Sequence, residues 1–318
     1  MSSIPLSTSN FKQRRARARL IKALLFVGVA CLFALSFQYF FEKRVILGSE
    51  SAAAYKVNRI LYQQHPNEIP IFGPSTAQGD LIPSVLGPDF FDYGIDGVRE
   101  DVLLFFMEQE CRKQKANRHL VAVFTMEGFT YGLGDLNAYI PNSNSPAVRN
   151  LLGDNYKLYY SIPFIKYYGQ YDSYLKDYLN ERMMLTKYKD RGASIEKDII
   201  TPEKFNTLVR DRMNSVGRFR NDTVLEQRFV RLVRDHPDRD FVILIPPFHP
   251  SYFNKFENYD DALRFFSYLS QFPNIRILNY SHQFYPDDCY LNTTHLNYRG
   301  AVLFNNMIKD TLQKIIAE

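Results

Sequence analysis

The sequence predicts an α/β fold with a doubly wound parallel sheet, a helical tyrosine-rich insertion and one N-terminal transmembrane helix. Three observations support this prediction. Short apolar runs alternate with helical stretches from residue 52 onward, and strands separated by helices pair in parallel through right-handed crossovers. Tyrosines crowd the stretch from about residue 135 to 220, and a continuous apolar segment lies near the start of the chain.

The apolar segment covers residues 23–41 and is interrupted by Ser36 and Gln38 alone. At about 1.5 Å per residue, a helix of this length spans roughly 28 Å, which is close to the thickness of the hydrocarbon core of a bilayer. Lys and Arg residues precede it and aromatic residues lie at its end, as in a membrane anchor whose N-terminus is cytoplasmic. We therefore expect a basic cytoplasmic tail over residues 1–22, a transmembrane helix over 23–41 and an extracytoplasmic domain over 45–318.

Two other interpretations of this segment stay open. The first is a cleaved signal peptide with its cut site among the small residues 51–54, although the apolar region of a signal peptide is normally about 7–15 residues long. The second is a lipoprotein cysteine at Cys31, but further apolar sequence follows this residue. The length of the apolar run favours the uncleaved anchor.

The composition is that of a folded protein, since 46% of the 318 residues are hydrophobic and 23% are charged. The formal net charge of +5 comes from the tail, because residues 1–22 contribute +6 and leave −1 for the rest of the chain. This distribution excludes a nucleic-acid-binding surface. Cys111 and Cys289 are expected to be unrelated buried thiols unless the fold brings them together, and the scattered His residues argue against a metal site.

The elements of the outer domain follow from the spacing of apolar residues. Residues 120–125 (LVAVFT) form an unbroken apolar run with β-branched side chains, which indicates a buried strand. Residues 98–116 place apolar side chains at helical spacing, which indicates a long amphipathic helix. By the same criteria, strands are expected at 69–72, 90–93, 241–245 and 275–278, and helices at 52–64, from the turn after 72 to about 86, and at 223–233, 260–269 and 298–317. The stretch 135–220 has no strand signal, so we expect a largely helical insertion, whose tyrosines could stack on sugar rings.

A serine follows the first expected strand. Gly73 and Pro74 form a turn after this strand, and Ser75 comes next. Ligand sites of doubly wound folds lie at the carboxyl ends of the strands, where Ser75 would be presented as a nucleophile at the start of a helix whose N–H groups favour negative charge. The alternative is structural, because a serine after Gly-Pro is also a good turn residue and helix N-cap.

A histidine lies between the last expected strand and the last helix, in the segment 292–301 (NTTHLNYRGA). Because both segments follow strands of one parallel sheet, we expect His295 to approach Ser75 to within about 4 Å and to accept its hydroxyl proton. Asn292, three residues earlier, is placed to hold the imidazole in the required tautomer. A helix cap explains Asn297 but does not explain His295.

Together these segments resemble the SGNH (GDSL-like) hydrolase superfamily over roughly residues 67–130 and 223–318. The resemblance implies that Ser75 is the nucleophile and His295 the general base. The stretch 92–97 (DYGIDG) is similar to the second block of the family, which implies that the amides of Gly97 and Ser75 form the oxyanion hole. The implied fold is a three-layer sandwich, and no cofactor or metal is expected.

Two positions depart from the pattern of the family. Asn292 stands where the family has Asp, and no residue of 124–130 clearly matches the Asn of its third block. An Asn can orient an imidazole, but it cannot stabilise the imidazolium as a carboxylate does. Either Asp287 or Asp288 supplies the acid, or Glu127 supplies a polar group at the end of its strand. Otherwise the activity is weak, or the domain has lost catalysis and only binds.

Two further residues are candidates for binding substrate. Glu127 follows the strand at 120–125 and supplies a polar group near its end, and His249 follows the strand at 241–245. Both strand ends lie at the edge of the sheet where ligands are expected. His249 equally fits a loop histidine that packs beside the prolines flanking it.

A single-pass, outward-facing member of this superfamily resembles the bacterial enzymes that work beside membrane-bound O-acyltransferases in modifying cell-surface polymers. The resemblance implies a location in the inner (cytoplasmic) membrane, and acyl-ester hydrolysis or transfer on an envelope polysaccharide. The alternative is a catalytically weak or inactive glycan-binding partner of such a transferase. A secreted lipase or esterase is disfavoured, because neither the anchor nor the insertion suggests a lipid-binding face.

Overall fold

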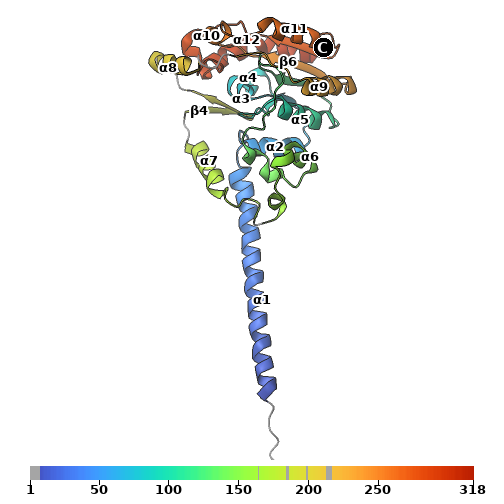
Figure 1. Cartoon of the computed structure of the whole chain (residues 1–318), viewed down its shortest axis with the longest axis vertical. Coiled ribbons are helices and arrows are strands. Elements are labelled where there is room, and N and C mark those ends of the chain that lie inside the picture. Colours follow the sequence, from blue (N-terminus) through green and yellow to red (C-terminus); the bar gives the residue numbers. More distant parts are fainter. Residues whose placement is uncertain (1–7, 164, 184–185, 198–199, 213–216) are drawn as a thin grey trace, which may run out of the picture.

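The computed structural model describes residues 8–163, 165–183, 186–197, 200–212 and 217–318. One long helix, α1 (Thr8–Phe41), projects from a layered domain (Figure 1). A short π-helical stretch, η1 (Glu42–Ile46), joins α1 to the domain. In the described part of the chain, Ala16–Ile46 is the one helical segment long and apolar enough to cross a membrane. It contains the segment expected to do so.

Five parallel strands form the central sheet and confirm the predicted α/β class. They are β1 (Ile69–Phe72), β2 (Phe90–Asp92), β3 (His119–Val123), β6 (Asp240–Ile245) and β7 (Ile275–Asn279), in the order β2-β1-β3-β6-β7. The first strand, β1, lies in the interior of the sheet. β2 pairs with it on one side, and β3, β6 and β7 follow in sequence order on the other side. The order therefore reverses between β1 and β3, and doubly wound sheets bind ligands outside the carboxyl ends of the strands at such a point.

Helices cover both faces of this sheet. One face carries α2 (Ala53–Tyr62), α5 (Glu100–Cys111), α9 (Thr223–Asp235) and α11 (Tyr259–Leu269), and the other carries α3 (Ser75–Asp80), α4 (Pro83–Leu86) and α12 (Tyr298–Ala317). Side chains alternate between the two cores along a strand, since Leu120 and Ala122 of β3 join the first core and Val121 and Val123 the second. Burial on both faces explains the unbroken apolar runs of the strands.

Two expected helices differ from the structure. The helix expected at 98–116 spans only Glu100–Cys111, and it is buried on nearly every side rather than amphipathic. The reason is that α5 packs against the sheet and also against α2 and α9. The helical stretch expected up to residue 86 is divided into α3 and α4, because the chain is extended at Leu81 and Ile82, before Pro83.

The insertion contains strands as well as helices. Its helical elements are α6 (Pro146–Leu152), α7 (Tyr171–Met183) and α8 (Pro202–Arg212), with 3₁₀ turns η2 (Leu136–Ala138), η3 (Ile140–Asn142), η4 (Gly153–Asn155) and η5 (Leu158–Ser161). The expectation that it lacks strands is wrong, because β4 (Lys187–Asp190) and β5 (Ala193–Glu196) form an antiparallel hairpin. Arg191 and Gly192 join the strands with φ of 43° and 92°, as the left-handed pair of a type I′ turn does. Ala193 and Ile195 of β5 are buried in the core beside α3 and α12.

Two short elements, α10 (Pro250–Phe253) and η6 (Asp287–Cys289), complete the described elements of the domain. Cys111 and Cys289 are free and buried, as expected for unrelated thiols. Cys31 is exposed on α1.

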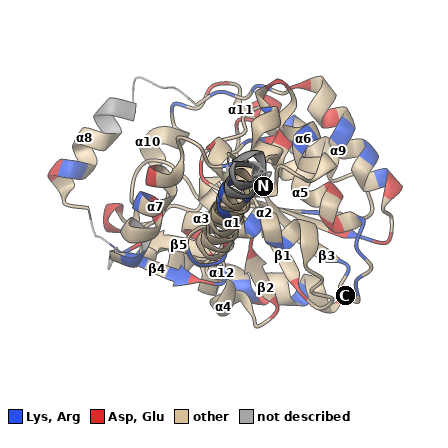
Figure 2. Ribbon diagram, turned by 90° about the horizontal axis from the view of Figure 1, so that it is seen from below, with Lys and Arg blue, Asp and Glu red and all other residues tan. Residues whose placement is uncertain are grey.

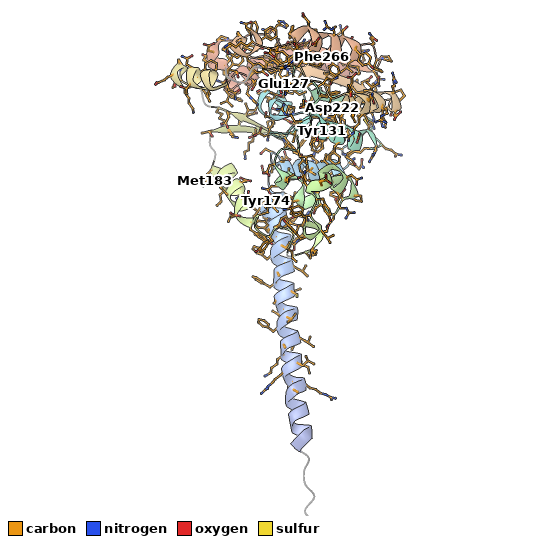
Figure 3. The ribbon with its side chains drawn as sticks, viewed as in Figure 1. Glu127, Tyr131, Tyr174, Met183, Asp222 and Phe266 are labelled. Carbon is orange, nitrogen blue, oxygen red and sulfur yellow. The ribbon has the colours of Figure 1, made fainter. Side chains whose placement is uncertain are left out.

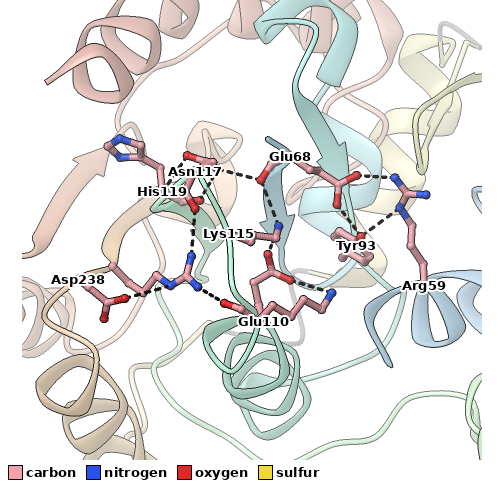
Figure 4. A network of polar contacts seen from close by, with 10 residues as sticks. Arg59, Glu68, Tyr93, Glu110, Lys115, Asn117, His119 and Asp238 are labelled. Atoms are coloured by element: carbon pink, nitrogen blue, oxygen red, sulfur yellow. Dashed lines mark hydrogen bonds and ion pairs between the residues drawn. The ribbon is translucent and has the colours of Figure 1, made fainter. Parts of the chain in front are cut away.

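A polar network lies at the amino ends of β1 and β3 (Figure 4). Glu68, just before β1, accepts a hydrogen bond from Tyr93 Oη at 2.7 Å and pairs with Arg59 of α2 at 2.5 Å. Its backbone carbonyl accepts hydrogen bonds from Asn117 Nδ2 at 2.8 Å and Lys115 Nζ at 3.2 Å. Because these carbonyl contacts lie at the edge opposite the strand carboxyl ends, we assign the network a structural role.

Candidate active site

Ser75 lies where the chain turns from β1 into α3. Pro74, in an extended conformation, is the N-cap residue of α3, and Ser75 is the first residue of that helix. A Cβ on Gly73 would lie 2.7 Å from that of Ala77 and 2.8 Å from that of Val123. This turn therefore needs glycine, which lets α3 approach β3 closely and presents Ser75 at the carboxyl edge of the sheet.

His295 lies directly opposite Ser75. Its Nε2 is 2.8 Å from Ser75 Oγ, and this distance confirms the predicted approach of the two side chains. Both residues are half-buried, so that the pair is partly shielded from water and still reachable. A base at this distance from a hydroxyl is in position to take its proton.

The hydrogen bonds of Asn292 orient the imidazole. Asn292 Oδ1 accepts the backbone N–H groups of Thr294 at 2.9 Å and of His295 at 3.1 Å, so the oxygen of the amide, and not its NH₂ group, faces this loop. The same oxygen lies 3.1 Å from His295 Nδ1, and Thr294 Oγ1 lies 3.0 Å from that nitrogen. Two acceptors beside Nδ1 favour the tautomer with its proton there, which makes Nε2 the acceptor for the Ser75 hydroxyl proton.

Asp80, at the end of α3, ties the helix of the serine to the loop of the histidine. Its Oδ1 accepts the N–H of Leu296 at 2.9 Å, and its backbone carbonyl accepts Nδ2 of Asn305 from α12 at 2.8 Å. Asp80 is fully buried, and this burial raises the pKa of its carboxyl well above the ordinary value. No motif in the sequence marks this residue.

A cavity of about 270 Å³ opens beside the Ser75–His295 pair. It is lined by Pro74, Ser75, Thr76, Asp96, Gly97, Val98, Arg99, Thr125, Glu127, Gly217, Phe248, Tyr252, Thr294 and His295. Gly97 has a φ of +73°, a conformation that strongly favours glycine. The structure thus brings the predicted nucleophile, base and Gly97 to one cavity. The role of the Ser75 and Gly97 amides as an oxyanion hole stays a prediction.

Glu127 lines this cavity, and two residues that the sequence did not mark hold its carboxylate. Arg99 Nη1 pairs with Oε2 at 2.9 Å, and Tyr252 Oη donates to Oε1 at 2.9 Å. The side chain of Glu127 is 32% exposed, and in Figure 3 it lies within the domain, well away from α1. Arg99 precedes α5 and Tyr252 lies on α10, so only the fold brings them to Glu127.

The first turn of α5 holds the loop that follows Glu127. Thr130 donates its N–H and its hydroxyl to Glu100 Oε2 at 2.9 and 3.1 Å. Gly132 donates its N–H to Asp101 Oδ1 at 3.0 Å. Burial raises the pKa of Glu100 to about 7, against the opposing effect of the hydrogen bonds from Thr130. Burial also raises the pKa of Asp101.

Three residues considered for the site have other partners. His249 is the N-cap of α10, and its Nε2 lies 3.1 Å from Asp287 Oδ1. His249 is not among the described residues that line the cavity, which favours its interpretation as a packed loop histidine. Asp288 pairs with Arg299. Among the described residues, neither Asp287 nor Asp288 forms a hydrogen bond or an ion pair with His295, which disfavours both as the acid of the pair.

The tyrosines of the insertion also lie elsewhere. Tyr160, Tyr167 and Tyr174 form a buried cluster with Phe41 at the end of α1. Of the described residues of the insertion, Gly217 alone lines the cavity. The structure therefore does not place these tyrosines where they would stack on a sugar bound beside Ser75.

The fold and the site define an α/β protein with a Ser–His–Asn arrangement at the carboxyl edge of its parallel sheet. No protein-family model and no curated protein matches the chain. A solved structure from Streptococcus pneumonia, described as "a putative platelet activating factor", is similar to it with 11% sequence identity, coverage of 88% of this chain and 99% of that chain, and a TM-score of 0.42.

Proposed function

We propose that the chain is an SGNH-type serine esterase or acyltransferase that acts on acyl esters. The observation that carries this proposal is the 2.8 Å contact of Ser75 Oγ with His295 Nε2, with Asn292 at the other ring nitrogen. The order of elements supports the SGNH resemblance, because Ser75 follows β1, Gly97 follows β2 and His295 precedes α12.

In the proposed reaction, Ser75 Oγ attacks the acyl carbonyl carbon while His295 Nε2 takes the hydroxyl proton. The amides of Ser75 and Gly97 stabilise the carbonyl oxygen as it becomes negative. His295 then gives the proton to the leaving alcohol, and the acyl group stays bonded to Ser75. A water molecule or an acceptor hydroxyl, deprotonated by His295, attacks this acyl-enzyme and releases Ser75, so hydrolysis and transfer differ only in the second nucleophile.

The cavity supports a short, polar acyl ester as substrate. Its volume of about 270 Å³ suits a small acyl group and part of its acceptor better than a long lipid chain. Asp96, Arg99 and Glu127 line it and provide polar groups for a hydroxyl-rich acceptor. These polar groups support a hydroxyl-rich acceptor. We propose that this acceptor is an envelope polysaccharide, that the domain lies outside the inner membrane and that its partner is a membrane-bound O-acyltransferase.

A second candidate function is a glycan-binding or assembly partner without catalysis. One observation favours it, namely that Asn292 stands at the position of the acid and brings no negative charge to His295. In a serine protease, the change of the triad Asp to Asn lowers turnover about 10⁴-fold.

Reaction with a fluorophosphonate probe distinguishes the two functions. We expect the full-length protein to gain the mass of one phosphonyl group at Ser75, because an activated hydroxyl displaces the fluoride of the probe. Ser75→Ala should abolish the label, whereas Ser84→Ala, which removes an exposed serine of α4, should leave it unchanged. Folded wild-type protein that gains no label at Ser75 would exclude catalysis and leave the binding function.

A further inference from the structure

Tyrosines of the insertion enclose the end of α1. Phe41 packs on Tyr167, Tyr171 and Tyr174 with ring centroids 6.1, 5.0 and 6.4 Å apart, and only 6% of Phe41 is exposed. Phe37, one turn earlier, also contacts Tyr171, at 6.3 Å. Figure 3 shows Tyr174 beside the upper end of α1. The domain is therefore packed directly onto the helix.

Hydrogen bonds also link the end of α1 to the insertion, and we call this contact region the joint. Glu42, the first residue of η1, accepts a hydrogen bond from Tyr167 Oη at 2.7 Å, and Lys166 Nζ lies 3.5 Å from the same carboxylate oxygen. Lys166 also donates to the backbone carbonyl of Pro141 at 2.5 Å. Because Lys166 and Tyr167 are buried, these contacts hold the domain at one height along α1.

This height places part of the insertion at the membrane surface when α1 spans the bilayer. Phe37 lies inside the apolar segment 23–41, about 6 Å before its end at 1.5 Å per residue. Tyr171, which contacts Phe37, then lies at the level of the lipid headgroups. In Figure 1, the chain between α6 and α7 lies beside the upper turns of α1, below the rest of the domain.

The same part of the chain exposes large apolar side chains. Leu158 is 74% exposed, Ile162 42%, Ile165 44% and Tyr168 77%, and we call these four residues the rim. Exposed apolar residues continue on α7 at Leu175, Leu179 and Met183. Exposed apolar side chains that are concentrated in this way mark a surface that contacts a partner or a membrane.

The charges near the rim are balanced. The lysines and aspartates of residues 157–177 are Lys157, Lys166 and Lys176 against Asp172 and Asp177, and Lys166 is paired with Glu42. Figure 2, which looks along α1 toward the domain, shows basic and acidic residues interspersed over this side. A strongly basic or acidic partner is therefore disfavoured, whereas an apolar surface with balanced charges suits the interface of a bilayer.

We propose that the rim inserts its apolar side chains into the lipid surface on the domain's side of the membrane, as a second contact besides α1. We infer that the bilayer, and not a protein, contacts the rim. The rim continues the exposed apolar surface of α1, and the contacts of Phe37, Phe41 and Glu42 hold it against that helix. The proposal rests on the proposed membrane anchor and not on the chemistry of Ser75. It gives the insertion a lipid-binding face, which the sequence did not suggest.

Lipid-borne quenchers test the rim in the full-length protein. Leu158→Cys and Tyr168→Cys, each in a Cys31→Ser background, are labelled with an environment-sensitive dye and reconstituted into phosphatidylcholine vesicles. Cys111 and Cys289 are buried and do not compete for the dye. A spin label high in the acyl chains should quench both dyes at least about twofold more than a dye at Val224→Cys, an exposed apolar position on α9.

A dye on the native Cys31, which is exposed on α1 and near the middle of the apolar segment, distinguishes the anchor from the rim when the spin label lies near the ends of the acyl chains. Quenching at Cys31 and at both rim positions supports the proposal. Quenching at Cys31 without quenching at the rim overturns it. Absence of quenching at Cys31 overturns the anchor and the rim together, and none of these results alters the expected labelling of Ser75 by a fluorophosphonate.

Discussion

Asn292 is the residue at which the site departs from a Ser–His–acid triad. Its Oδ1 makes four contacts of 2.9 to 3.1 Å with Thr294 and His295, and a carboxylate in the same position can accept all of them. Asn292→Asp should therefore keep the loop geometry and add a negative charge that stabilises protonated His295. We expect kcat for hydrolysis of a small acetyl ester to rise at least about tenfold.

Two variants make this measurement specific. Ser75→Ala in the Asn292→Asp background should return the rate to that of buffer. Asn306→Asp adds the same charge at an exposed position of α12 and should leave kcat unchanged. If wild type and Asn292→Asp are equally inert and Ser75 resists the fluorophosphonate, the binding function is the correct one.

The residues of the site were predictable to different degrees. Ser75 and His295 stand 220 positions apart, but each follows the end of an apolar strand, and parallel strands end at the same edge of a sheet. Asp80, Arg99 and Tyr252 carry no comparable signal. They reach the site through contacts with Leu296 and Glu127, which only the folded chain creates.

Among the elements, the first turn of α5 should make stability depend on pH. Burial raises the pKa of Glu100 from 4.5 to about 7, so between these values the folded chain keeps a proton that the unfolded chain has lost. The free energy of unfolding should therefore fall as the pH rises from about 4.5 to about 7, by up to about 3 kcal/mol for this group, and then level off. Glu100→Gln should remove this contribution and still offer Thr130 an oxygen.

Chemical unfolding at about pH 5 and about pH 7.5 measures the effect. The raised pKa values of Asp80, Asp92 and Asp101 act in the same direction, so the difference between wild type and Glu100→Gln isolates this carboxyl. Glu203→Gln, at an exposed position in the first turn of α8, should retain the wild-type slope. An unchanged slope in Glu100→Gln would show that its carboxyl does not keep the proton in the folded state.

Elements with a strong local signal matched the structure best. The strands at β1 and β6 were predicted almost to the residue, since buried parallel strands read as unbroken apolar runs. The hairpin of β4 and β5 was not predicted. Its strands are mostly polar, and only Ala193 and Ile195 of β5 alternate with polar residues as in a half-buried strand. Its turn residues, Arg191 and Gly192, are not the Asn-Gly or Asp-Gly pair most typical of such turns. The helical spacing of its apolar residues predicted that α5 is amphipathic, but Glu100 and Asp101 are also buried, and their carboxylates accept hydrogen bonds from N–H groups of the loop.

For the whole molecule, the joint between α1 and the insertion is the feature that sequence patterns could not predict. Tyr167, Tyr171 and Tyr174 are more than 120 residues from Phe41, and tyrosine is common on semi-exposed surfaces. Because they pack on Phe41, the end of α1 is part of the folded domain and does not merely connect the domain to the membrane. The orientation of α1 in the membrane would then set the side on which the cavity lies.

That orientation is predicted by the charges before the apolar segment. The cations in residues 1–22 are Lys12, Arg14, Arg15, Arg17, Arg19 and Lys22, and no acid offsets them. Because Lys and Arg are retained on the cytoplasmic side, a reporter fused after Glu318 should be active only if it is of the periplasmic type. Replacement of all six cations by Gln should produce a mixed orientation with cytoplasmic-type activity, whereas Lys309→Gln with Lys314→Gln, two changes on α12, should leave the topology unchanged. Cytoplasmic-type activity from the wild-type fusion would place the Ser75 cavity inside the cell and rule out an envelope polysaccharide as its substrate.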